Sequence, residues 1–304
     1  MRLACVTGGD DRYFLHLLLL IASFRRHCRG RQLLVCDFGL DPRRRGFLER
    51  HVQLLPLPAG LEVRHVWDKK AALLRYLAGE PFDAMLWIDT DAMLVADAPG
   101  ELERIATGSD EALYCCAEDQ TIEGFIAQQR AKPEGLVEHF AEAAARMGVP
   151  GDRPYLNSGF FLCRSREFLA AWERLARSLP LHVLFEQNAF NLLAHSTVGF
   201  HGLERSQWNC SNADLDRVRR AAGGACITDR GEPVRVIHCT TNSRNIDVLD
   251  TRIEFEGGKT GLTGMLRVPM NPAIRALQQE LIEFVASELP ALKAHGLIEP
   301  GPAA

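Results

Sequence analysis

The chain has 304 residues, of which 47% are hydrophobic and 24% are charged, and its formal net charge is −4 at pH 7. This length suits one large α/β domain or two small ones, and the composition is ordinary for a globular protein. The slight acidic excess argues against a nucleic acid as the main partner, because no strongly basic field surrounds the molecule. The most apolar early stretch, 14–24, is shorter than the roughly 20 residues of a membrane span, so it predicts a buried helix.

Nine cysteines are scattered along the chain without Cys-x-x-Cys spacing. Their odd number, and the adjacency of Cys115 and Cys116, argue against a disulfide framework or a zinc site. We therefore expect small buried side chains in a reducing compartment and a cytoplasmic protein.

The first hundred residues alternate between short apolar runs and helical segments. Strands are predicted at 3–7, 32–36, 63–66 and 84–88, and helices at 13–27, 42–51 and 69–77. This alternation predicts a mostly parallel sheet flanked by helices. Ligands of such sheets bind beyond the carboxyl ends of the strands.

Beyond Pro99 the pattern is less regular. Strands are predicted at 113–117, 159–163 and 234–238, and helices at 135–147, 166–178, 186–194 and 271–287. Residues 254–264 are rich in Gly and Thr, and we expect this segment to be mobile. No linker or internal repeat divides the chain, so a single composite domain over 1–304 is expected.

Two carboxylates, Asp89 and Asp91, directly follow the apolar run 84–88. At the end of a strand both can turn toward one hard cation, which is how proteins hold a nucleotide diphosphate. Asp-x-Asp is a short pattern that also recurs by chance. His238, at the end of the predicted strand 234–238, is either a third ligand or a structural histidine. Imidazole with carboxylates suits manganese better than calcium.

Two further polar groups accompany predicted elements. Asn157 and Ser158 offer short hydrogen-bonding side chains, and Gly159 lets a ligand approach the backbone, although a plain turn before a strand explains the triplet as well. Glu186 and Gln187 stand at a predicted helix start, where the helix dipole alone favours an acid.

Taken in order, these motifs resemble the metal-dependent glycosyltransferases of the GT-A fold, above all the family 8 group that includes glycogenin and bacterial lipopolysaccharide sugar transferases. The ordered set is Val6-Thr7-Gly8-Gly9-Asp10, Asp89-Thr90-Asp91, Asn157-Ser158-Gly159, Glu186-Gln187 with Asn191, Trp208-Asn209 and His238. The resemblance runs from about residue 3 to residue 245. It implies a Rossmann-like α/β fold with a nucleotide-binding half at about 1–100, a donor-sugar and acceptor half at about 101–270, and a C-terminal helical segment at 271–304.

The resemblance also implies a role for each matched residue. Asp89, Asp91 and His238 would bind Mn²⁺, or Mg²⁺, together with the donor diphosphate. The nucleoside and the sugar would be bound by Thr7, Asp10, Tyr13, Asn157, Ser158 and Gly159. Catalytic roles near the reacting sugar carbon fall on Glu186 and Gln187.

The basic residues of the family have partial matches. Lys69 or Lys70 matches its basic residue at the start of the helix before Asp-x-Asp, Lys70 as a catalytic group and Lys69 as a donor-binding one. Arg244 stands where the family has a phosphate-binding lysine, although the Gly, Pro and Trp of that His-x-x-Gly-x-x-Lys-Pro-Trp ending are absent. Glu186 replaces the family's aspartate.

The implied function is a hexosyltransferase that moves a sugar from a UDP-sugar, with retention, to a glycan, a lipid-linked sugar or a small molecule. No nucleic-acid partner is expected, and membrane association has no support in the sequence. Two alternatives stay open. One is a haloacid-dehalogenase-type phosphatase, which also carries Asp-x-Asp after a strand, and the other is a non-catalytic nucleotide-sugar-binding protein.

Overall fold

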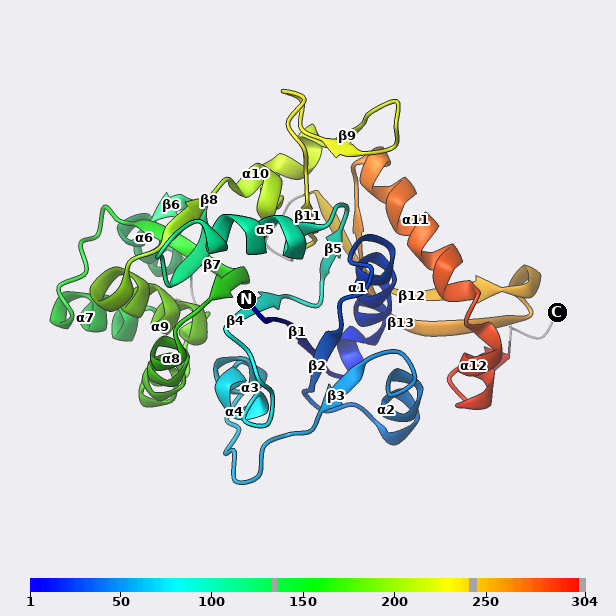
Figure 1. Ribbon diagram of the computed structural model, residues 1–304, viewed down its shortest axis with the longest axis horizontal. Helices are drawn as coiled ribbons and strands as arrows, with labels where there is room; N and C mark the ends of the chain where they lie inside the picture. The colour runs from blue at the N-terminus through cyan, green and yellow to red at the C-terminus, as the bar shows by residue number, and fades with distance from the viewer. Residues whose placement is uncertain (133–135, 241–244, 301–304) are drawn as a thin grey trace. The chain divides into compact units, whose positions relative to one another are not determined.

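The computed structural model describes residues 1–132, 136–240 and 245–300 (Figure 1). Within these residues the main sheet has seven strands in the order β3-β2-β1-β4-β7-β6-β8. The pairs β1–β2, β2–β3 and β6–β8 are parallel, whereas β6–β7 is antiparallel. The mostly parallel α/β sheet predicted from the alternation of elements is therefore confirmed.

The strands are β1 Leu3–Gly9, β2 Leu33–Asp37, β3 Gln53–Leu55, β4 Ala84–Ile88, β5 Ala92–Leu94, β6 Leu113–Thr121, β7 Pro154–Cys163, β8 His201–Leu203, β9 Arg219–Arg220, β10 Cys226–Ile227, β11 Val236–His238, β12 Ile246–Phe255, β13 Thr260–Pro269 and β14 Glu299–Pro300. The α-helices are α1 Phe14–His27, α2 Pro42–Leu48, α3 Val66–Ala71, α4 Leu73–Tyr76, α5 Ala98–Thr107, α6 Ile122–Arg130, α7 Glu138–Arg146, α8 Arg166–Ser178, α9 Phe185–Leu193, α10 Arg205–Trp208, α11 Pro272–Ala286 and α12 Leu289–Ala294. Short 3₁₀ turns lie at Asp11–Tyr13, Asn212–Arg217 and Glu256–Gly258, and a π turn follows α9 at Ala194–Val198.

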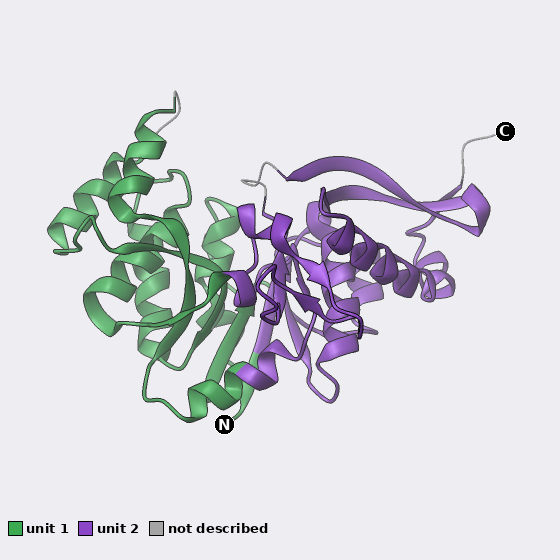
Figure 2. Ribbon diagram, turned by 90° about the horizontal axis from the view of Figure 1, so that it is seen from above, with its two compact units in different colours: residues 1–4, 56–87, 102–205 green, residues 5–55, 88–101, 206–304 purple. Residues whose placement is uncertain are grey.

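The chain forms two compact units, coloured separately in Figure 2. Unit 1 comprises residues 1–4, 56–87 and 102–205, and unit 2 comprises residues 5–55, 88–101 and 206–304. The expected functional halves, with a boundary near residue 100 and a C-terminal segment from 271, stay a prediction.

Unit 2 is built around α1 and the parallel strands β1 and β2. Residues 14–24 of α1 are all buried, which confirms the predicted buried helix, and α1 packs against β5, α11 and β13. The strands β12 and β13 form a long antiparallel hairpin, from Ile246 opposite Pro269 to Phe255 opposite Thr260 (Figure 1). Residues 254–264, which the sequence predicts to be mobile, form the turn of this hairpin and the adjoining ends of its two strands.

Unit 1 is built around β6, β7 and the helices α8 and α9. Its core contains a cluster of aromatic rings, with Phe161 and Phe190 4.9 Å apart between centroids and Trp172 5.5 Å from Phe190. The helix α8 begins where Ser165 accepts a hydrogen bond from the amide of Phe168, as an N-cap serine does. Strand β7 and helix α9 contact each other in this core.

One local prediction in unit 1 is wrong, and one alternative reading of a motif there is excluded. The expected strand at 63–66 is absent, because His65 caps α3 in a reciprocal capping box with Asp68, which favours a helix start over an extended run. The Asn157-Ser158-Gly159 triplet lies inside β7 and is not a turn before it.

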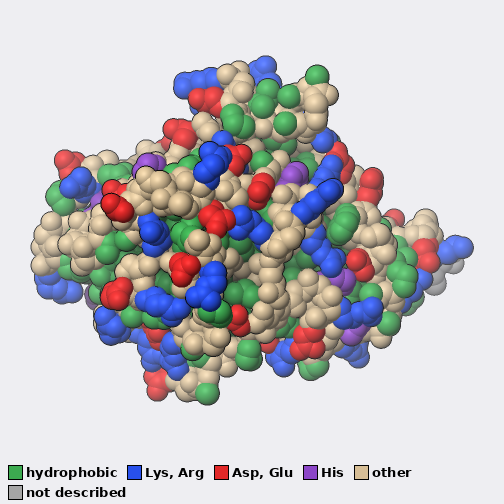
Figure 3. Space-filling model, viewed as in Figure 1, with side chains coloured by type: hydrophobic (Ala, Val, Ile, Leu, Met, Phe, Trp, Pro, Cys, Tyr) green, Lys and Arg blue, Asp and Glu red, His purple; other side chains and the backbone are tan. Residues whose placement is uncertain are grey.

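All nine cysteines are free and buried, and their burial agrees with the expectation of small buried side chains. Within the described part of the chain, no helix has both the length and the apolar character that crossing a membrane requires. On the face shown in Figure 3, Lys and Arg side chains lie among Asp and Glu side chains, so this face has no field of a single sign.

Candidate functional site

In unit 2, strand pairing brings the two predicted acidic ligands to the predicted histidine. Asp89 follows β4 directly, and Asp91 immediately precedes β5. The strand β11 pairs antiparallel with β5 so that His238 lies opposite Ala92. The amide of Cys239 also donates to the Asp91 carbonyl at 3.0 Å. The pairing of β11 with β5 thus makes neighbours of Asp91 and His238, which are 147 positions apart in the sequence.

The side chains of Asp89, Asp91 and His238 point to a common place. His238 Nε2 is 3.2 Å from Asp91 Oδ1 and 3.7 Å from Asp89 Oδ2, and one ligand atom from each residue lies within 4.8 Å of the other two. Asp91 and His238 are buried, whereas the Asp89 side chain is 26% exposed. The cluster is therefore anchored inside the protein and open to solvent at one carboxylate.

These residues fit a divalent cation. His238 Nδ1 is 2.8 Å from Asn209 Oδ1. An amide oxygen can only accept a hydrogen bond, so this contact assigns the proton to Nδ1 and turns the Nε2 lone pair toward the carboxylates. A neutral imidazole with two carboxylates suits Mn²⁺ or Mg²⁺. Among the described residues, Asp89, Asp91 and His238 form the one group of three or more His, Cys, Asp or Glu side chains whose ligand atoms lie close enough together to hold a metal ion.

The positively charged side chain of Arg267, on β13, also contacts this site, and the sequence analysis did not predict it. Its Nη1 forms an ion pair with Asp91 Oδ2, and its Nη2 donates to Tyr13 Oη at 2.8 Å. Burial lowers the pKa of Arg267 from its ordinary value, while the nearby Tyr13 and Asp89 oppose that shift. The isolated Arg in the apolar run Met265 to Val268 was the only sequence signal, and it did not identify its partner.

The residues predicted to bind the nucleoside lie at the end of β1, in the same unit. Thr7 is fully buried, and its hydroxyl has no hydrogen-bond partner among the described residues. Asp10 caps the 3₁₀ turn by accepting from the amide of Tyr13 at 3.2 Å. The hydroxyl of Thr90 donates to the Gly8 carbonyl, which joins the end of β1 to the Asp-x-Asp loop. Thr7, Asp10 and Tyr13 thus stand on the same short segment, next to the cluster of acids.

Unit 1 contains a second buried polar cluster, formed by the other predicted site residues. Lys70 Nζ lies 3.2 Å from Glu186 Oε1 and 3.1 Å from Ser158 Oγ. The Ser158 hydroxyl is also 3.2 Å from Glu186 Oε2, and its amide donates to Gln187 Oε1 at 3.0 Å. The structure therefore brings Lys70, Ser158, Glu186 and Gln187 together, with Lys70 as the lysine that makes these contacts. Lys69 is half-buried on the same helix.

The asparagines around this cluster hold the backbone of β7 in place. Asn157 Oδ1 accepts from the Gly159 amide at 2.6 Å, and its Nδ2 donates to Glu118 Oε1 at 2.5 Å. Asn191 of α9 satisfies both backbone groups of Leu156, at 2.6 Å and 2.9 Å. The predicted triplet Asn157-Ser158-Gly159 is thus a part of β7 that side-chain hydrogen bonds hold in place. The remaining predicted residue, Arg244, lies outside the described residues.

Comparison with known proteins bears on the fold. No family model matches this sequence, and no curated protein matches it. The structure is similar to the apo structure of the bifunctional glycosyltransferase WbbM, with a TM-score of 0.59 at 14% identity over 96% of this chain and 51% of that one. It is also similar to the glycosyltransferase GlyE of Streptococcus pneumoniae TIGR4, with a TM-score of 0.51 at 12% identity over 100% of this chain and 66% of that one.

The chain has the fold of these glycosyltransferases. The GT-A fold class expected from the ordered motifs is therefore confirmed. The chain spans about half of the length of WbbM and 66% of that of GlyE. Since both identities are low, the similarity concerns the fold.

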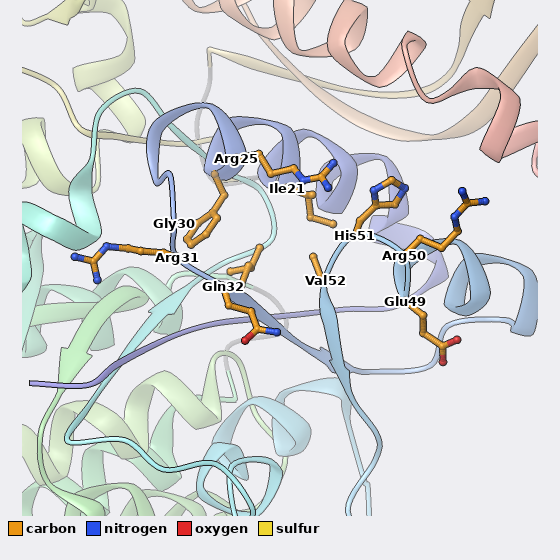
Figure 4. Close-up of a pocket in the computed structure, with 11 residues that line it drawn as sticks. Ile21, Arg25, Gly30, Arg31, Gln32, Glu49, Arg50, His51 and Val52 are labelled. Atoms are coloured by element: carbon orange, nitrogen blue, oxygen red, sulfur yellow. The ribbon is translucent and has the colours of Figure 1, made fainter.

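A surface pocket in unit 2 lies away from the predicted site residues of that unit. It is a hollow of about 410 Å³ lined by residues at the starts of β2 and β3, among them Gln32 and Val52, and by Arg25, Arg50 and His51 (Figure 4). The predicted nucleoside-binding residues stand at the opposite, carboxyl end of this parallel sheet, at the end of β1. Because ligands of such sheets bind at the carboxyl ends, this hollow is not the candidate site.

Proposed function

We propose that this chain is a metal-dependent glycosyltransferase that moves a hexose from a nucleotide-sugar, a UDP-sugar, to an acceptor hydroxyl. The observation that carries the proposal is the convergence of Asp89, Asp91 and His238, with atoms within 4.8 Å of one another, in a chain with a glycosyltransferase fold. The proposed donor nucleotide and the retaining stereochemistry come from the family resemblance of the motifs.

Asp89, Asp91 and His238 would hold Mn²⁺ or Mg²⁺. When bound, such a cation acts as a Lewis acid on the phosphate oxygens of the leaving diphosphate. The protein contributes a fixed ligand geometry, because Asn209 holds the ring of His238. Ligands held by such outer partners need little reorganisation when charge develops on the leaving group.

Thr7, Asp10 and Tyr13 would bind the nucleoside. The support is the buried Thr7 hydroxyl, which has no described partner, and the hydrogen bond from Thr90 to the Gly8 carbonyl, which joins this segment to the metal ligands. The aromatic ring of Tyr13 could stack on a base, while its hydroxyl accepts from Arg267.

In unit 1, Asn157, Ser158 and Gly159 would bind the donor sugar, and Glu186 with Gln187 would act near its reacting carbon. The buried Glu186 carboxylate, in contact with Ser158 and Lys70, is suited to stabilise positive charge on a sugar ring. Gln187 would position Ser158 through the backbone amide of that residue. Lys70 would keep the carboxylate in place, and Lys69 and Arg244 would add positive charge toward the diphosphate.

The test is a screen of UDP-, GDP- and CMP-sugars with Mn²⁺, read by released nucleotide, on the wild type, Asp91→Asn and the matched control Asp110→Asn. Asp110 is exposed, so its substitution should leave turnover unchanged. We expect release from a UDP-sugar that requires the metal and falls at least about a hundredfold in Asp91→Asn, since outer-shell changes alone cost about 10–100-fold.

Equal turnover in Asp91→Asn and wild type would reject the metal site. A second measurement separates an enzyme from a binding protein. If UDP with Mn²⁺ raises the melting temperature but no donor is consumed, the chain is a non-catalytic nucleotide-sugar-binding protein. Metal-independent hydrolysis of small phosphoesters would instead favour the phosphatase alternative. The acceptor and the cytoplasmic location stay predictions.

A further inference from the structure

Arg267 is a buried cation held rigidly beside the proposed metal ligands. It is only 6% exposed. Its backbone amide donates to His16 Nε2 of α1 at 3.1 Å, and its carbonyl accepts from Gln278 Nε2 of α11 at 2.9 Å. Helices on two sides therefore fix this position of β13, and the side chain starts from a defined place.

The guanidinium is committed to the candidate site by both of its terminal nitrogens. Nη1 contacts Asp91 Oδ2 and donates to the Cys239 carbonyl at 3.1 Å. Nη2 donates to Tyr13 Oη at 2.8 Å, and the guanidinium carbon lies 5.2 Å from the centre of the Tyr13 ring. Arg267 thus joins one proposed metal ligand to one proposed nucleoside-binding residue.

The two oxygens of Asp91 have different neighbours. Oδ1 lies 3.2 Å from His238 Nε2, on the side where a cation would be shared with Asp89. Oδ2 is held by Arg267. Asp91 could therefore coordinate a metal ion through Oδ1 without displacing the Arg267 guanidinium from Oδ2.

The charge of the site follows from these contacts. Two carboxylates and a neutral imidazole would give a formal charge of −2, which attracts a divalent cation strongly. The Arg267 guanidinium reduces this charge to −1, and it lies against one of the ligands. The guanidinium and a bound metal ion would both be positive and would repel each other even at a high effective dielectric constant. Arg267 therefore weakens the binding of a cation that arrives without a nucleotide. An incoming diphosphate carries the negative charge that the site lacks.

We propose that Arg267 makes cation binding at Asp89, Asp91 and His238 depend on an anionic nucleotide. Without the diphosphate the guanidinium keeps the affinity for the cation low, and with the diphosphate the two positive charges share an anionic partner. The binding of the nucleotide and of the cation is then linked, and by thermodynamic reciprocity each strengthens the other equally. This inference rests on the metal site of the proposed function.

The test measures Mn²⁺ dissociation constants from the electron paramagnetic resonance signal of free Mn²⁺, with and without UDP, after accounting for Mn²⁺–UDP in solution. Wild type, Arg267→Gln, Arg267→Lys and Asp91→Asn are compared, and circular dichroism checks that each is folded. In wild type we expect UDP to tighten Mn²⁺ binding at least about tenfold. Arg267→Gln should bind Mn²⁺ alone about tenfold more tightly than wild type, and UDP should tighten it less. Arg267→Lys keeps the charge and should retain the linkage.

A purely structural role predicts the opposite sign, because loss of support for Asp91 would weaken Mn²⁺ binding in both arginine variants. Arg267→Gln that binds Mn²⁺ alone no more tightly than wild type overturns the inference. The wild-type measurement tests it even if Arg267→Gln does not fold, since Mn²⁺ binding unaffected by UDP also overturns it. If wild type binds no Mn²⁺ even with UDP, or Asp91→Asn binds it equally well, the metal site of the proposed function fails and the inference fails with it.

Discussion

Replacing Lys70 by Met should destabilise unit 1 by about 3–5 kcal/mol, because it removes the buried cationic partner of Glu186. The Nζ–Oε1 distance is 3.2 Å, and the two side chains are 8% and 3% exposed. At this distance an effective dielectric constant of about 20 gives a direct attraction of about 5 kcal/mol. The desolvation of both charges offsets part of this attraction in the folded protein, but the single substitution leaves the desolvation cost of the carboxylate in place.

The assay is a double-mutant cycle in urea, with Lys70→Met, Glu186→Gln and the double variant. Because the double variant buries no unbalanced charge from this pair, it should be more stable than Lys70→Met, and we expect a coupling energy of about 2–3 kcal/mol. A coupling energy below about 0.5 kcal/mol would refute the reasoning, since it is within the range of independent sites.

The same cycle separates the two explanations of Glu186. If Glu186 is only half of a structural ion pair, the refolded double variant should release nucleotide as fast as wild type. If Glu186 acts near the reacting sugar carbon, the double variant should be folded but slow, by about 10²-fold or more, as for other groups that stabilise a transition state electrostatically.

Three further changes have defined outcomes. Asn209→Ala should weaken Mn²⁺ binding about 10–100-fold, because the ring of His238 loses the acceptor for its Nδ1 proton. Calorimetric titration with Mn²⁺ measures this loss, and an unchanged melting temperature of the variant shows that its fold is intact. Burial and the nearby arginine lower the pKa of His16 to about 3. In the unfolded chain His16 has its ordinary pKa of 6.5, so below that pH the unfolded state binds one more proton there than the folded state. Wild type should therefore lose about 2 kcal/mol more unfolding free energy between pH 7 and pH 5 than His16→Gln. Urea titrations in which both proteins lose the same unfolding free energy over this pH range would contradict this. Gly8→Ala should cost about 1–3 kcal/mol, because its Cβ would lie 2.5–2.8 Å from ring atoms of Phe38, and Phe38→Leu should restore part of that loss in thermal melts.

The parts of the fold that sequence patterns predicted best are those with strong local periodicity. The strand Ala84–Ile88 and the helix Arg166–Ser178 have the predicted bounds, because a fully apolar run and a capped amphipathic stretch specify their own structure. Strand β1 extends two residues beyond its prediction, through Gly9, which pairs with Asp37 of β2. Tertiary pairing overrode the local turn signal of the two glycines there.

The parts that were missed depend on distant partners. The glycines and threonines of residues 254–264 do not indicate the β12–β13 hairpin, because its pairing is a property of ten facing residue pairs. The acid–histidine cluster could be predicted because each member ends a strand or follows one. Arg267 could not, because it belongs to none of the ordered motifs and an arginine in a strand more often faces solvent.

The binding of one divalent cation by Asp89, Asp91 and His238 is tested most directly by Mn²⁺ anomalous scattering from crystals soaked with MnCl₂ and UDP. We predict a single strong anomalous peak in contact with Asp91 Oδ1, an Asp89 oxygen and His238 Nε2, with UDP phosphate oxygens at the same ion, and no such peak in Asp91→Asn crystals. Ordered UDP with no anomalous density among these three side chains, or a peak held by other residues, would contradict the account.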